Sequence, residues 1–144
     1  MKRVAPLCAF VVVLAACGGA SGLTKAEYDA KVSRLCLVAA DQFRELHMDN
    51  SVAAWKYNAP TIIHIGQHFD HALAALKAPS DLAAGATAYL KANETVLADD
   101  KAAVAAATAG DGGSLRTAIR QANKDTASGS RSAKAIGATG CYIP

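Results

Sequence analysis

The chain has 144 residues, 52% of them hydrophobic and 19% charged, and a formal net charge of +3. These values fit one folded domain with a real core and exclude a disordered chain. The charge falls to +1 if Lys2 and Arg3 are removed, and no basic helix face remains, so we expect no nucleic-acid partner.

The N-terminus has the pattern of a bacterial lipoprotein signal. Lys2 and Arg3 precede an apolar run over residues 4–16, which is shorter than the roughly 20 residues that a membrane-spanning helix needs. The run ends in Leu14-Ala15-Ala16-Cys17, where small residues admit the signal peptidase and the cysteine thiol takes a diacylglyceryl group. We therefore predict a signal peptide over 1–16, lipidation with palmitate-type chains at Cys17, and a flexible Gly/Ser/Ala tether over 17–23.

Lipidation at Cys17 would place the protein on the outer, extracytoplasmic face of the cell membrane, because two or three acyl chains hold a protein firmly to a bilayer. Two alternatives stay open. In the first, residues 1–16 belong to an ordinary signal peptide that is cleaved after a different small residue. In the second, they form an uncleaved membrane anchor.

The four cysteines divide by position. Cys8 lies in the predicted signal and Cys17 is the predicted lipidation site. Cys36 and Cys141 remain as an even pair in an oxidising compartment, which favours one disulfide between them. Two free buried thiols are the alternative, and a metal site built on these two distant cysteines is a third.

The first predicted helix opens at a capping box. Thr24 can accept a hydrogen bond from the first-turn amides, and Glu27 can reach back to residue 24. The apolar spacing then predicts a helix to about residue 47, with Cys36 beside an inward stripe. That stripe consists of Tyr28, Val32, Leu35, Ala39, Phe43 and Leu46.

A second helix is predicted after the break at residues 49–51. Pro60 either starts its main part or kinks it. Apolar residues recur at helical spacing and define its core face. They are Ile62, Ile65, Phe69, Leu73 and Leu76.

Two further helices follow. Pro79 ends the second helix, and Ser80 or Asp81 is predicted to cap a third that ends near residue 110. Ser114 is predicted to cap a fourth helix. This helix has the weakest helical pattern of the four, because the Ser-Gly-Ser segment at residues 128–130 interrupts it. We find no alternation typical of strands, so residues 24–144 are predicted to be an all-α, up-down-up-down four-helix bundle, with a tail that folds back toward Cys36.

Several short motifs resemble a known group of proteins. They are the opening Leu23-Thr24-Lys25-Ala26-Glu27-Tyr28, Cys36, the segment Leu76-Lys77-Ala78-Pro79 and the closing Ile136-Gly137-Ala138-Thr139-Gly140-Cys141. Together they resemble small helical lipoproteins of actinobacteria, a largely uncharacterised family. The resemblance spans the mature chain and implies a lipid anchor, a helical bundle and one disulfide. It implies no activity and carries over no catalytic residue.

One cluster could bind metal. His64, His68 and His71 are spaced i, i+4 and i+7 on the second predicted helix, on a stripe roughly 100° or more from the core face. An accessible i, i+4 histidine pair can chelate zinc or copper, and His47 could approach it at the turn between helices. Surface histidines without a ligand, or a surface that responds to mildly acidic pH, are the alternatives.

The remaining residues give no signature of catalysis. Nucleophile-elbow, zinc-protease and phosphate-loop motifs are absent, so an enzyme is not expected. Asn93 and Asp100 fall near the inner stripe of the third helix, either as interior polar groups or where the stripe is wet. The sequence thus predicts a membrane-anchored, non-enzymatic module that binds an unknown protein or small-molecule partner or serves the cell envelope, or, alternatively, a zinc- or copper-binding lipoprotein.

Overall fold

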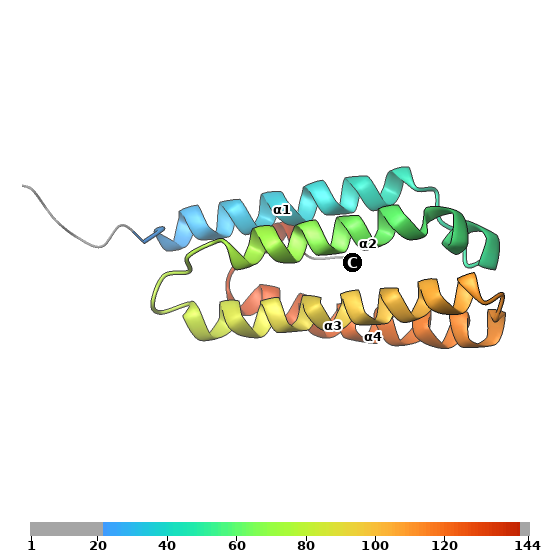
Figure 1. Ribbon diagram of the computed structural model, residues 1–144. Coiled ribbons are helices and arrows are strands. Elements are labelled where there is room, and N and C mark those ends of the chain that lie inside the picture. Colours follow the sequence, from blue (N-terminus) through green and yellow to red (C-terminus); the bar gives the residue numbers. More distant parts are fainter. Residues whose placement is uncertain (1–21, 142–144) are drawn as a thin grey trace, which may run out of the picture.

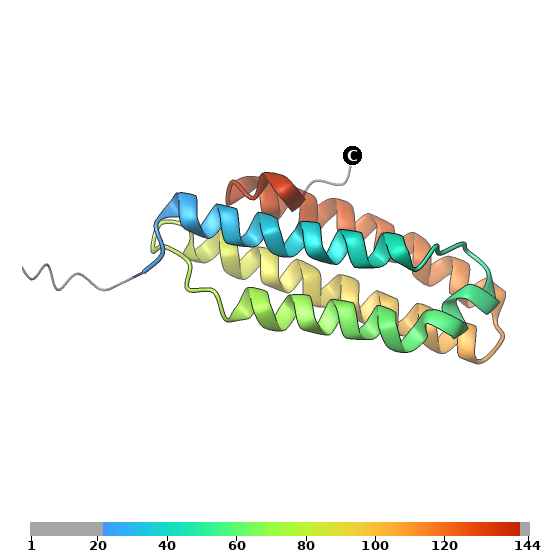
Figure 2. The same cartoon turned by 90° about the horizontal axis from the view of Figure 1, so that it is seen from above.

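The computed structural model describes residues 22–141, which form four long helices and one 3₁₀ turn (Figure 1). Successive helices are antiparallel in both views, which confirms the predicted up-down-up-down bundle (Figures 1 and 2). The elements are α1 (Lys25–Glu45), α2 (Val52–Ala74), α3 (Ala83–Thr108), α4 (Gly112–Ala135) and η1 (Thr139–Cys141). The predicted signal peptide, Cys17 and the tether as far as residue 21 lie outside the described residues.

The capping box at the start of α1 is present. The Thr24 hydroxyl accepts from the amide of Glu27 at 3.3 Å, and the Glu27 carboxylate accepts from the amide of Thr24 at 2.8 Å. Two amides that the first turn leaves without helical partners are satisfied in this way. The helix ends at Glu45, two residues before the predicted end, and His47 then turns the chain with a φ of 46°.

Pro60 lies inside α2 rather than at its start. The helix begins at residue 52, where the Ser51 hydroxyl accepts from the amide of Ala54 at 3.1 Å. Because proline has no amide hydrogen and its ring crowds the preceding turn, it bends a helix. Figure 1 shows the first turns of α2 inclined to the rest of the helix, in agreement with the kink alternative.

The predicted caps of α3 and α4 are wrong. Neither Ser80 nor Asp81 caps α3; Leu82 is the N-cap residue and makes no side-chain cap bond, but its side chain is buried in the core. Burial of an apolar side chain fixes this helix start in place of a cap. At α4 the cap is Asp111, whose carboxylate accepts from two backbone amides at 2.9 and 3.0 Å and from the Ser114 hydroxyl at 2.7 Å.

The predicted interruption of α4 at residues 128–130 is also wrong. The helix runs through to Ala135, and Gly129 is buried within it. A Cβ at Gly129 would lie 3.8 Å from the Cβ of Ala92, an ordinary contact distance, on the side where α4 packs against α3. A glycine inside a helix costs about 1 kcal/mol relative to alanine, and the close helix packing here outweighs that local preference.

The core has two clusters, one toward each end of the bundle. Between them, Asn93 and Asp100 lie partly buried on α3, and the Asn93 amide donates to the Tyr89 carbonyl oxygen at 2.8 Å. The cluster near the N-terminal end of α1 contains Tyr28, Val32, Leu73, Leu82, Tyr89, Ala133, Ile136, Ala138 and Cys141. The other contains Ala103, Ala107 and Leu115, with Val52, Trp55, Ala106, Ala118 and Ile119 packed against it.

The predicted inward stripe of α1 is right at its start and wrong near its end. Tyr28 and Val32 are fully buried, whereas Phe43 is 36% exposed. The reason is that α1 packs against α2 and η1, and η1 covers it only around Cys36. The last two turns of α1 therefore have no neighbour on that side.

The C-terminal turn attaches to α1 by a disulfide and a close backbone contact. Cys36 and Cys141 are bonded, with their Cα atoms 5.1 Å apart, as predicted. The amide of Gly140 donates to the Ser33 hydroxyl at 3.1 Å, and a Cβ at Gly140 would come within 2.9 Å of the Ser33 carbonyl oxygen. Only glycine fits at this position without displacing α1.

Within residues 22–141, the helices lack any stretch apolar and long enough to cross a membrane.

Replacing both bonded cysteines, Cys36→Ala with Cys141→Ala, is expected to lower the free energy of unfolding by about 4 kcal/mol, because the bond spans 105 residues and restricts the unfolded chain. Urea denaturation monitored by far-ultraviolet circular dichroism measures the difference, with the reduced wild-type chain as control. A loss below about 1 kcal/mol would show that this restriction is not what the bond contributes.

Candidate functional site

The histidine cluster lies on the outer surface of α2. His64, His68 and His71 are all exposed, as predicted for a stripe away from the core. The rings of His64 and His68 are neighbours, with centroids 6.2 Å apart and planes tilted by 34°. The structure therefore brings two of the three imidazoles together.

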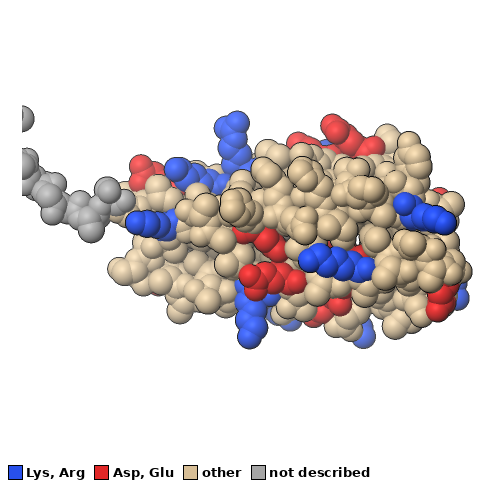
Figure 3. Space-filling model, viewed as in Figure 1, with Lys and Arg blue, Asp and Glu red and all other residues tan. Residues whose placement is uncertain are grey.

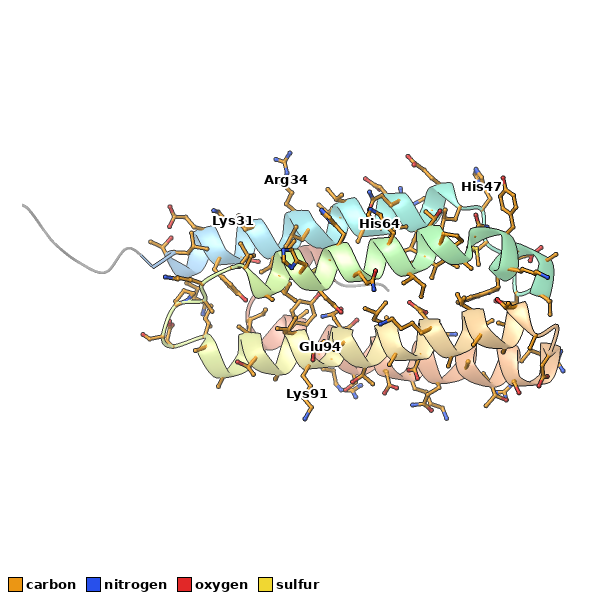
Figure 4. The ribbon with its side chains drawn as sticks, viewed as in Figure 1. Lys31, Arg34, His47, His64, Lys91 and Glu94 are labelled. Carbon is orange, nitrogen blue, oxygen red and sulfur yellow. A yellow bond between two sulfur atoms is a disulfide. The ribbon has the colours of Figure 1, made fainter. Side chains whose placement is uncertain are left out.

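No third ligand joins this pair among residues 22–141, where no group of three or more histidine, cysteine or acidic side chains is positioned to hold a metal ion. His47 does not approach it: Figure 4 shows His47 at the far end of α1, well separated from His64. Two exposed imidazoles thus make at most a bidentate contact, whereas zinc sites in proteins take three or four protein ligands.

A groove lies between α1 and α2. Its volume is about 480 Å³, within the range of roughly 300–1,000 Å³ typical of small-molecule sites. Its walls are mostly aliphatic and aromatic, and Val38 on the rim is 45% exposed. The apolar lining consists of Leu35, Val38, Ala39, Ile65, Phe69, Ala72, Ala75 and Leu76.

Small side chains create this groove. Ala39 on α1 and the pair Ala72 and Ala75 on α2 line it, and a methyl group fills little of the space between two helices. Sequence reasoning missed the groove. The available signal was alanine on or beside the core face of both predicted helices, which leaves their contact unfilled.

The polar residues of the groove are mainly basic. Lys31, Arg34 and His68 line it together with Gln42, and no aspartate or glutamate does. Figure 3 shows the corresponding surface of α1 and α2 as largely uncharged, with basic side chains toward the N-terminal end of α1. His68 is thus the one predicted site residue that also lines the groove.

Buried carboxylates lie on the other side of α2. Asp70 is half-buried, and its Oδ2 is enclosed and makes no hydrogen bond within the described chain. Burial and the nearby Glu94 raise the pKa of Asp70 to about 6, against an opposing effect of Lys101. Asp70 and Glu94 therefore form an acidic region between α2 and α3, outside the groove.

Two more carboxylates with shifted pKa lie on α3. Burial, and to a lesser degree the neighbouring Asp99, raises the pKa of Asp100 to about 6. Burial and the facing Asp125 of α4 raise the pKa of Asp99. The middle of the bundle thus carries carboxyl groups that are costly to ionise.

These groups are not arranged for recognised chemistry. In residues 22–141 the side-chain hydrogen bonds include none made by a histidine, so no hydroxyl or thiol is paired with an imidazole base there. The two cysteines of the described residues, Cys36 and Cys141, are bonded to each other. The Cys36 Sγ also lies 3.1 Å from the hydroxyl oxygen of Tyr89. Nothing positive in the described part of the chain indicates catalysis.

Comparison with known proteins gave no match: neither a family model, nor a curated protein, nor a solved structure is similar to this chain. Its function is therefore argued from its own geometry.

Asp100→Asn is expected to stabilise the protein at pH 7.5, by about 3 kcal/mol, and to change little at pH 4. The folded protein holds the Asp100 proton up to about pH 6, whereas the unfolded chain releases it near the ordinary value of 3.8. The folded state binds more protons in this window, so wild-type stability falls as pH rises from about 4 to 6.

Urea denaturation at both pH values measures this effect. The control is Asp81→Asn, at an exposed position between α2 and α3. Equal stabilisation of Asp100→Asn at pH 4 and pH 7.5 would contradict the argument, because a protonation effect must disappear at low pH.

Proposed function

We propose that the protein is a lipoprotein held on the outer face of the cell membrane through Cys17, and that it acts there as a non-enzymatic binding module. The binding surface is the groove between α1 and α2. The observation that carries the proposal is the groove itself, an apolar hollow of about 480 Å³ with basic residues on its rim.

The physical argument concerns apolar surface left in contact with water. Val38 is 45% exposed, and the small side chains of Ala39 and Ala72 leave the wall beside it unfilled. Burying such surface is favourable by about 25 cal/mol per Å², so a ligand that covers the groove gains free energy that the bundle alone does not. A concave apolar hollow with a few polar groups at its edge is the usual form of a binding site.

The histidines support a metal-binding function less well. The neighbouring rings of this cluster are those of His64 and His68, which offer two adjacent imidazoles. A zinc or copper site normally draws on more protein ligands than this. The groove is therefore the better candidate for the functional surface.

The anchor is tested by replacing its attachment residue. In a bacterial host that processes lipoproteins, cells grown with radioactive palmitate are expected to label the wild-type chain and not Cys17→Ser, because only the cysteine thiol can take the diacylglyceryl group. Gel fluorography of the purified protein and its intact mass measure this. Equal labelling of both chains, or an unmodified wild-type N-terminus, would refute the anchor.

The groove is tested by filling it. Ala72→Phe, which puts a phenyl ring into the groove, is expected to weaken binding of the uncharged dye N-phenyl-1-naphthylamine by about tenfold. Fluorescence titration of the mature chain, residues 17–144 with Cys17→Ser to avoid detergent, measures this. Ala98→Phe, at an exposed alanine of α3 outside the groove, is the matched control and is expected to bind dye as the parent chain does.

Circular dichroism and the intact disulfide establish that each variant is folded. If folded Ala72→Phe and Ala98→Phe bound the dye equally well, the groove would not be the binding surface, and the proposed function would lose its support.

A further inference from the structure

We propose that the groove between α1 and α2 binds a long-chain fatty acid. The acyl chain lies along the apolar walls, and the carboxylate lies at the end formed by Lys31 and Arg34. This inference rests on the proposed function, for which the groove is the binding surface, and it names the ligand class.

The walls suit a hydrocarbon chain. Leu35, Val38 and Ala39 line one side, and Ile65, Phe69 and Ala72 line the other. None of these six side chains can form a hydrogen bond, so the part of a ligand that contacts them should be apolar. An acyl chain meets this condition, because it has no polar group along its length and gains free energy with each methylene it buries.

The length of the groove suits one extended chain. Its α1 wall runs from Lys31 to Gln42, which is about 17 Å at the rise of a helix. A partner helix is about 10–12 Å across with its side chains, and it would rest on the rim rather than enter a hollow between two packed helices. A single acyl chain can enter the hollow.

The positive charges of the groove lining lie at one end of the groove. Because α1 and α2 are antiparallel, Lys31 lies at the same end of the groove as Leu76, while Gln42 and Ile65 lie at the other. Lys31 and Arg34 are the two permanent cations of the lining, and both are exposed. Figure 4 shows Arg34 extending outward from α1 into open space, on the side away from α2.

Neither cation is engaged by an acid. The sole ion pair within residues 22–141 joins Arg44 to Asp41. Glu27, one turn before Lys31, is held at the helix start by the backbone and hydroxyl of Thr24, both at 2.8 Å from its Oε2. The pKa of Glu27 is lowered by its hydrogen bonds with Thr24 and, as the smallest effect, by Lys31, so Lys31 has an acid nearby but no direct ion pair. The lining thus carries positive charge without a direct ion pair beside an apolar hollow, and a fatty-acid carboxylate with its chain is the simplest complement.

The first experiment measures chain length. The Cys17→Ser mature chain, with its disulfide intact, is titrated calorimetrically with octanoate, decanoate and dodecanoate below their micelle concentrations. Each added pair of methylenes is expected to tighten binding about tenfold while the chain still fits the groove. Affinity that does not change from octanoate to dodecanoate would overturn the proposal, because the chain would then not be buried.

The second experiment measures the head group. Lys31→Gln with Arg34→Gln is expected to weaken dodecanoate binding about fivefold, as for two exposed ion pairs, and to leave binding of uncharged dodecanol unchanged. Lys91→Gln is the matched control, since Lys91 extends from α3 away from the groove (Figure 4). Unchanged dodecanoate binding by the double variant would overturn the assignment of the carboxylate to this end.

The outcomes separate this inference from the proposed function. If the dye binds in the groove and dodecanoate does not displace it, the fatty-acid assignment fails while the binding module stands. Displacement by an acidic amphipathic helical peptide but not by dodecanoate would identify a helical partner and overturn the fatty acid. If Ala72→Phe leaves dye binding intact, the groove itself is wrong and both proposals fail.

Discussion

The rest of the structure depends on how α1 is held against its two neighbours, α2 and η1. This helix packs against α2 on one side and against the short turn η1 on the other, so η1 holds the edge of α1 that α2 does not reach. The Cys36–Cys141 bond and the close approach of Gly140 to Ser33 fix η1 in place. Because η1 is short, α1 is well buried at its start and open to water near its end, where Phe43 lies.

Small residues have opposite effects on packing at different contacts between helices: some allow close packing, and others leave a hollow. A Cβ at Gly66 would lie 2.7 Å from a methyl group of Leu97, and one at Gly85 would lie 2.7 Å from a methyl group of Ile136. At these points the missing side chain is filled by a large neighbour, and the helices are tightly packed. At Ala39 and Ala72 no large neighbour fills the space, and the groove results.

The sequence predicted the parts of this fold that depend on local chemistry. Thr24 and Glu27 cap α1 because their spacing places each side chain beside the other residue's amide. The Cys36–Cys141 bond was expected because these are the two cysteines outside the predicted signal peptide and lipidation site. Sequence prediction failed where packing between distant segments decides: Leu82 precedes α3 with its side chain buried in the core, and Gly129 lies buried within α4, which packs along α3. Phe43 has helical spacing but no neighbour, which periodicity cannot show.

The same division holds for the candidate site. The exposure of His64, His68 and His71 followed from their angle to the core face. The groove did not, because a hollow depends on the sizes of side chains from two helices and on how those helices are aligned. Its basic rim combines Lys31 and Arg34 of α1 with His68 of α2, and only the antiparallel packing brings these residues to one surface.

The position of the disulfide has a consequence for proteolytic cleavage of the chain. The connections between the helices, residues 46–51, 75–82 and 109–111, all lie between the two bonded cysteines. A protease that cut any one of them would produce two pieces still joined through sulfur.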